Sequence, residues 1–187
     1  MVSMALVGRM VGRVEPRLLI VAGLLFTALS LWQMSQFDMN VTQSALAWTG
    51  LLQGIGMGFM FVPMSTIAFA TLEPRFRGDG SGLYSLGRNI GSSIGVSMLM
   101  GALAVYVRTN REQLVTFINP FNPLLHDPAL QRLADPRLPE GLELLNNIVQ
   151  REAMMLGYLD DFRLMMLVTF IAIPLVFTLR PLRPKPA

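Results

Sequence analysis

Cysteine is absent from the 187 residues, and the only histidine is His126, inside a polar stretch. Without thiols the chain can form no disulfide, no thiolate metal site and no thiol nucleophile. The long apolar runs also contain no pair of carboxylates for general acid–base catalysis. We therefore predict no enzyme, no catalytic residue and no metal ligand, and we interpret His126 as a solvated loop residue.

Charge is scarce as well. Only 14% of the residues are charged, against about 25% in soluble domains, while 52% are hydrophobic against about 45–50%. The mean hydropathy is +0.50. The sequence pI is near 9.9, but the basic residues are scattered at the ends of apolar runs instead of forming one face. This composition indicates a polytopic membrane protein and does not favour a nucleic-acid partner.

Four apolar runs are long enough to cross a hydrocarbon core, which takes about 20 residues of helix. They cover residues 18–35, 45–72, 81–107 and 162–179. We therefore expect an all-α membrane protein with four transmembrane helices. A soluble helical bundle is disfavoured because the first two runs carry no charge and so have no face for water.

The segments between the runs alternate in charge, and this alternation predicts the topology. The link 36–44 has no Lys or Arg, and 108–161 has five arginines against eight carboxylates. The basic residues gather in the other three flanks: Arg9, Arg13, Arg17, Arg75, Arg77, Arg180, Arg183 and Lys185. Because short basic loops mark the cytoplasmic side, we expect both chain ends in the cytoplasm and 108–161 outside.

Helical structure is also predicted for parts of two further segments, 108–161 and 1–8. In the outer loop 108–161, Asp127 and Pro128 predict the start of a short helix. A second, amphipathic helix is predicted from Pro139, leading into the fourth span, with apolar residues at helical spacing: Leu142, Leu145, Val149, Leu156 and Leu159. The opening residues 1–8 are apolar but too short to span a membrane and lack the basic start of a signal peptide. We interpret them as the tail of a helix, and the chain as a fragment.

Glycines recur at four-residue spacing on the second and third spans: Gly50, Gly54, Gly58, Gly87, Gly91 and Gly95. Small residues let membrane helices approach closely, so both glycine faces are predicted to pack tightly against neighbouring helices. In one arrangement the two faces pack against each other. Such faces serve either static packing or sliding during a conformational cycle. Leucine at Gly54 or Gly91 is expected to disturb packing more than leucine at Gly23.

Arg88 shares a helix face with Gly91, Ser92 and Gly95. It could extend its charge to the lipid headgroups, or it could point inward with a gating or positioning role. We favour the inward position because glycines mark the protein-facing side. Polar or soft side chains in mid-helix are candidates to line a substrate path: Gln53, Met57, Ser65, Asn89 and Ser92.

Several motifs resemble one known family. "GRMVGRVEPRLLI", residues 8–20, resembles a cytoplasmic loop motif of major facilitator superfamily transporters, carried here by Gly8, Arg13 and Arg17. The family usually has an aspartate where Gly12 stands. "QGIGMGFMFVPMSTIAFATL" and "GSGLYSLGRNIGSSIGVSML" are similar to fourteen-helix drug:proton antiporters, which include inner-membrane subunits of multidrug efflux pumps. "REAMMLGYLDDFRLMML" before the last span also resembles them.

The resemblance implies that residues 1–187 are the last four helices of an antiporter. Such a protein exports drugs or amphipathic compounds across the inner membrane, needs no cofactor besides a proton gradient, and rocks two bundles around a central site. The implied partners are the lipid bilayer, the missing N-terminal helices, a periplasmic adaptor subunit and a small apolar or amphipathic substrate. Alone, the chain is expected to be inactive. The alternative is a self-contained four-span structural or assembly protein that acts as an oligomer.

The topology can be tested in this cysteine-free chain by single cysteines. Cysteine replacing Asn40 or Asn122 should react with a membrane-impermeant thiol reagent added from outside, because both positions lie in links predicted to be external. Cysteine replacing Asp79 should react only after the membrane is opened. The reverse labelling pattern would overturn the predicted orientation.

Overall fold

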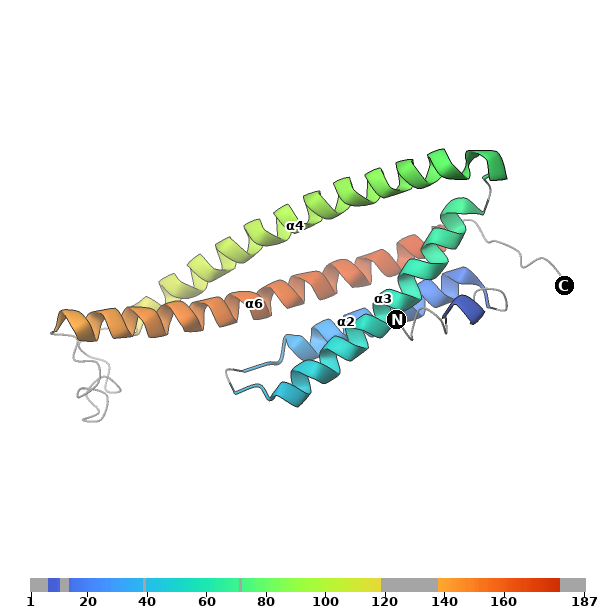
Figure 1. Cartoon of the computed structure of the whole chain (residues 1–187). Helices are drawn as coiled ribbons and strands as arrows, with labels where there is room; N and C mark the ends of the chain where they lie inside the picture. Colours follow the sequence, from blue (N-terminus) through green and yellow to red (C-terminus); the bar gives the residue numbers. More distant parts are fainter. Residues whose placement is uncertain (1–6, 11–13, 39, 71, 119–137, 179–187) are drawn as a thin grey trace. The chain divides into compact units, whose positions relative to one another are not determined.

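The computed structural model describes residues 7–10, 14–38, 40–70, 72–118 and 138–178. Its elements are α2 (Pro16–Met34), α3 (Gln43–Phe69), the short 3-10 helix η1 (Pro74–Phe76), α4 (Arg77–Thr116) and α6 (Pro139–Thr178) (Figure 1). Within these ranges there is no strand, and four helices are long and apolar enough to cross a membrane. The expected all-α membrane fold with four spans is confirmed.

The first two spans have nearly the predicted limits. α2 begins at Pro16, where proline's missing N–H costs no helical hydrogen bond. α3 contains Pro63 and ends at Phe69, five residues before Pro74 starts η1. The predicted second span, 45–72, therefore extended three residues beyond the end of the helix.

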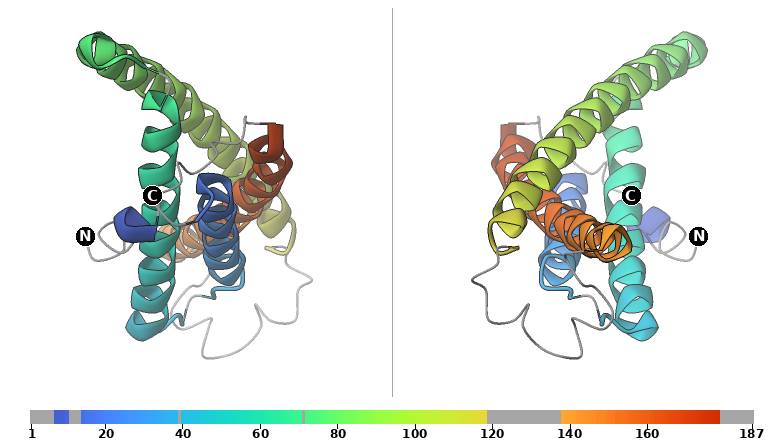
Figure 2. Two further views of the ribbon diagram at one scale, coloured as in Figure 1. Left: turned by 90° about the vertical axis from the view of Figure 1, so that its right-hand side faces the viewer. Right: turned by 90° about the vertical axis from the view of Figure 1, so that its left-hand side faces the viewer.

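The third and fourth spans are parts of much longer helices, which the predicted limits 81–107 and 162–179 did not anticipate. α4 and α6 each have 40 residues, or about 60 Å of helix, against a hydrocarbon core of about 30 Å. α4 continues because 108–116 contains neither Gly nor Pro, and because Arg108 pairs with Glu112 at 2.9 Å. Figure 2 shows both helices unbroken.

This continuity changes the picture of the outer loop 108–161. α6 begins at Pro139, where the amphipathic helix was expected, and runs without interruption into the fourth span. Both ends of the loop are thus extensions of the spans instead of separate short helices. The helix expected from Asp127 lies outside the described residues.

The chain divides into two compact units, and the first contains residues 1–97 and 162–187. Here α2 and α3 run side by side in opposite directions (Figures 1 and 2). Ile20 and Leu24 of α2 and Val176 of α6 form a buried cluster. Partly buried side chains from α2, α3 and α6 surround it: Val21, Met60, Ile67, Ala172 and Ile173. The end of α6 is therefore part of the same core as the first two spans.

Two glycines bring α2 and α3 into backbone contact. A Cβ added to Gly23 would lie 2.7 Å from the Gly56 carbonyl oxygen, and one added to Gly56 would lie 2.9 Å from the Gly23 carbonyl oxygen. One end of the same interface is held by the buried Ser30 hydroxyl, which donates a 2.9 Å hydrogen bond to the Thr49 carbonyl. No larger residue would fit at either glycine without moving a helix.

The second unit, residues 98–161, is an antiparallel hairpin of the last part of α4 and the first part of α6. On α6, buried residues recur at every fourth position: Leu145, Val149, Ala153 and Gly157. A Cβ at Gly157 would lie 3.2 Å from the backbone nitrogen of Val107. This apolar row therefore forms the side of α6 that meets α4.

Two polar contacts add to the hairpin. Asn110 Nδ2 donates to Asp160 Oδ2 at 3.1 Å, and Arg111 Nη2 donates to Asn146 Oδ1 at 2.9 Å. Each joins residues at least 35 positions apart along the chain. They fix which stretch of α6 lies beside which stretch of α4.

Within the described residues, five of the six row glycines make no close contact, which corrects the expectation that the two rows pack against each other. Nothing lies within 4 Å of a Cβ added to the glycines at positions Gly50, Gly54, Gly87, Gly91 and Gly95. Of the six, only Gly58 is buried. The close approach is instead made by Gly56 and by Gly23, the position at which leucine was expected to disturb packing less.

We expect Gly23→Ala and Gly56→Ala to destabilise the chain by about 1–3 kcal/mol, because the new methyl group meets backbone atoms that cannot move separately. Gly54→Ala is the matched control on the same helix, since its Cβ enters open space. Thermal unfolding in detergent, followed by size-exclusion chromatography, measures the difference. Equal midpoints for the three variants would contradict the backbone contact between α2 and α3.

Candidate substrate path and interfacial grooves

The predicted path residues lie on two helices. Gln53, Met57 and Ser65 are on α3, and Asn89 and Ser92 are on α4. The Ser65 hydroxyl donates to the Val62 carbonyl at 2.9 Å, and the Ser92 hydroxyl donates to the Asn89 carbonyl at 2.9 Å. Each hydroxyl proton is therefore used by its own helix, and what the two serines offer a ligand is an acceptor.

One of these residues, Ser65, lines a defined groove. The groove lies where α3 ends and α4 begins and has a volume of about 500 Å³. It is lined by hydroxyl groups, an aromatic ring and a cation: Ser65, Thr66, Phe69, Ala70, Arg77 and Ser81. The Phe69 ring also meets the Tyr84 ring edge to face, at 5.5 Å between centroids.

Arg88 is exposed on α4, and its guanidinium lies 5.8 Å from the centre of the Phe61 ring on α3. Such a cation–π contact contributes about 0.5–1 kcal/mol at an exposed site. Glu73, a carboxylate near the same end of the helix, is paired with Arg75 at 2.8 Å. Among the described residues Arg88 has no acidic partner. Sequence reasoning missed Phe61, because which residue of α3 lies below Arg88 depends on the packing of the two helices.

The loop-motif residues have different surroundings. Gly8 lies in a short helical stretch, 7–10, with open space where a side chain would be. Arg13 lies outside the described residues. The Arg17 side chain is only 16% exposed; its Nε is 3.8 Å from Glu15 Oε1, and it has no hydrogen-bond partner in the described part of the chain. A buried guanidinium with a donor unused is a favourable place for a further acceptor.

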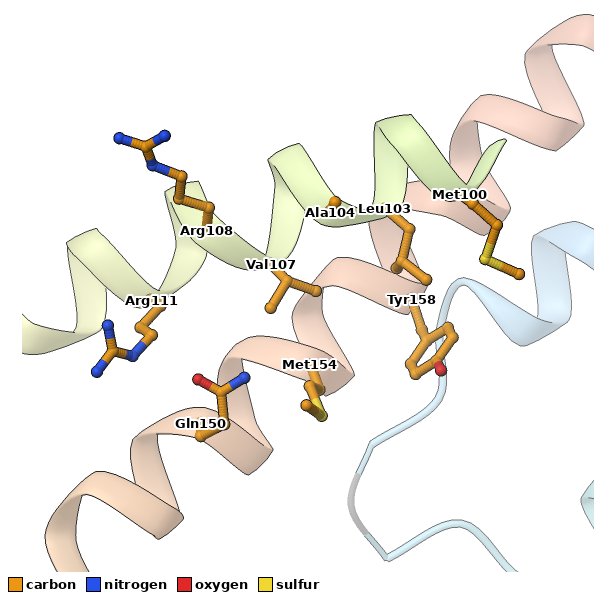
Figure 3. Close-up of a pocket in the computed structure, with 9 residues that line it drawn as sticks. All are labelled: Met100, Leu103, Ala104, Val107, Arg108, Arg111, Gln150, Met154 and Tyr158. Atoms are coloured by element: carbon orange, nitrogen blue, oxygen red, sulfur yellow. The ribbon is translucent and has the colours of Figure 1, made fainter. Parts of the chain in front are cut away.

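A second groove, not predicted from the sequence, lies within the hairpin of α4 and α6. Its volume is about 510 Å³. Nine residues line it: Met100, Leu103, Ala104, Val107, Arg108, Arg111, Gln150, Met154 and Tyr158 (Figure 3). The only hint in the sequence was the pair Arg108 and Arg111, one helical turn apart directly after an uncharged run. The lining residues on α6 are 39 to 50 positions away from these two arginines.

One carboxylate close to this hairpin is in an unusual state. Burial raises the pKa of the Asp161 carboxyl above its ordinary value, because a charged group loses hydration there. Its Oδ1 atom is buried without a hydrogen-bond partner in the described part of the protein. Burial thus disfavours the charged form of this carboxyl, relative to a solvated one, at the point where α6 approaches its apolar span.

Comparisons with known proteins bear on the whole chain. The sequence profile of the Major Facilitator Superfamily matches residues 1–110. The fatty acid resistance protein FarB of Neisseria gonorrhoeae is 22% identical over 94% of this chain and 35% of its own length. The multidrug export protein EmrB of Escherichia coli is 29% identical over 63% of the chain and 23% of its own length. The multidrug resistance protein Stp of Mycobacterium tuberculosis is 35% identical over 57% and 20%.

The chain therefore spans about a third or less of the length of these relatives. No solved structure matches it.

Proposed function

Because this chain belongs to the Major Facilitator Superfamily, we propose that it forms the C-terminal part of an exporter of drugs or amphipathic compounds driven by proton influx. The matching relatives are transporters, named for multidrug export or resistance, and not enzymes. The chain itself is a multi-pass membrane protein. In this proposal its four spans complete a bundle whose other helices come from the rest of the transporter.

The observation that carries the proposal is the bare surface of α4. None of the most apolar stretch of this span is buried, against 39% of the corresponding stretch of α2. Its open face carries Gly87, Gly91 and Gly95, together with Arg88. A face exposed only to lipid would gain nothing from glycines and would leave a charge without a polar partner. A neighbouring helix could pack closely on the glycines and supply a partner for Arg88. The predicted packing role of the glycine rows, including Gly50 and Gly54, thus becomes contact with helices outside this chain.

The finer parts of the proposal follow from charge. The spans contain no carboxylate, so the proton-coupling groups belong to the rest of the transporter. The basic flanks favour the inner membrane with both ends of the chain in the cytoplasm. The hairpin of α4 and α6 would then face outward, where a periplasmic adaptor subunit could reach it. Exposed, soft side chains such as Met57 suit varied apolar substrates along the path.

Substitutions of Arg88 test whether the exposed face of α4 has a role in transport. We expect both Arg88→Lys and Arg88→Gln in the complete transporter to lose most drug efflux, because neither keeps the planar fork of charged donors. Dye efflux and drug resistance are measured beside the amount of protein in the membrane. If lysine behaves like the parent and glutamine is nearly silent, Arg88 only extends to the headgroups.

The fragment proposal is tested by comparing the 187-residue chain alone with the same chain extended by the upstream helices encoded in its reading frame. The chain alone should give no dye efflux, and the extended protein should give efflux that collapses when the proton gradient is dissipated. A chain that forms a stable oligomer by itself, with no apolar reading frame upstream, would instead support the self-contained four-span protein.

A further inference from the structure

We propose that the groove between α4 and α6 binds one anionic phospholipid of the surrounding bilayer, with its acyl chain on the apolar part and its phosphate at Arg111. This site is separate from the proposed substrate path. It does not depend on what the complete transporter exports.

The groove is apolar at one end and polar and cationic at the other. At one end lie Met100, Leu103 and the ring of Tyr158, and at the other lie Arg111 and Gln150 (Figure 3). α4 is uncharged from Asn89 to Val107, and its first charge beyond is Arg108. The apolar end of the groove thus belongs to the membrane-spanning part of α4, and the cationic end projects from it. A lipid in one leaflet has the same orientation, with its charge away from the hydrocarbon.

The dimensions agree with this occupant. From Met100 to Arg111 the helix rises about 16 Å, which is close to half of a hydrocarbon core of about 30 Å. The volume of about 510 Å³ is large enough for part of an acyl chain. The lining side chains leave the groove open, since Met100 is 62% and Tyr158 49% exposed. A soluble anion such as inorganic phosphate would leave this apolar surface uncovered.

Arg111 is the positioned cation of the site. Its guanidinium is held by the 2.9 Å hydrogen bond to Asn146, which uses one of five N–H donors and leaves others for phosphate oxygens. Arg108 is turned the other way, toward Glu112, and its Nε lies 2.9 Å from the Glu112 carboxylate. Glu112 therefore competes with an anionic ligand for Arg108.

The test is native mass spectrometry of the full chain in detergent with added phosphatidylglycerol. Arg111→Gln should weaken retention about tenfold, because one charge-assisted phosphate contact is lost. The control Arg151→Gln, at an exposed arginine of α6 that follows Gln150 but is not among the residues that line the groove, should leave retention unchanged. Asn146→Ala removes the hydrogen bond that holds Arg111 but keeps the charge of Arg111, so it should weaken retention less than Arg111→Gln does.

Two more variants test the second arginine, Arg108, and the apolar part of the groove. Glu112→Gln should strengthen retention, since Arg108 is released toward the phosphate. Ala104→Phe fills the exposed apolar floor and should abolish retention without changing the elution volume or helix content.

Competition distinguishes the source of the anion. Phosphatidylcholine, oleate and inorganic phosphate should each displace phosphatidylglycerol poorly. Three results would overturn the proposal: equal retention by Arg111→Gln and Arg151→Gln, no effect of Ala104→Phe, or displacement by inorganic phosphate or oleate at the concentration of the lipid itself. Loss of folded protein with Ala104→Phe would also count against it, because that result means a protein segment and not lipid covers the groove.

Discussion

The backbone contact between Gly23 and Gly56 is the constraint on which the first unit depends. Helices in lipid gain no hydrophobic free energy by meeting, so their association comes from close packing and hydrogen bonds. The two glycines allow that packing, and the Ser30 hydroxyl adds a hydrogen bond to the Thr49 carbonyl where water is excluded. Met60, which lies against Gly23, also packs on the cluster that includes Val176 of α6. The contact between Gly23 and Gly56 thus lies beside the cluster in which α2, α3 and α6 meet.

The helices could be predicted from the sequence, whereas the contacts between them could not. Long apolar runs located all four spans, and apolar spacing located the start of α6 at Pro139. Glycine spacing indicated smooth faces at Gly54 and Gly91, but a smooth face does not say which neighbour it meets. Gly23 and Gly56 have no such row, because a backbone contact needs only one small residue on each side. The signal that could have found them is Gly23 followed by Thr27, one helical turn later.

Three arginines show why the candidate sites were only partly predictable. Arg88 was identified from its position in an apolar run, but its neighbour Phe61 is on another helix. Arg17 matched a loop motif, yet its burial is a property of the packed structure. Arg111 was counted only as a charge of the outer loop until α6 was found beside it. Sequence gives the residue type and its helix, and the environment comes from segments about 20 to 40 positions away.

α4 passes from one solvent to another, and its packing changes with the solvent. Between Ser81 and Val107 its one charge is Arg88, and its glycine face at Gly87, Gly91 and Gly95 is suited to lipid, where small residues allow contact. Beyond Arg108, where the proposed topology places the chain in water, burying apolar side chains becomes favourable. There the hairpin uses larger residues on α6, Leu145 and Val149, in addition to Ala153. A single helix therefore needs two kinds of partner, and among the described residues α6 is the helix that packs closely on its last part.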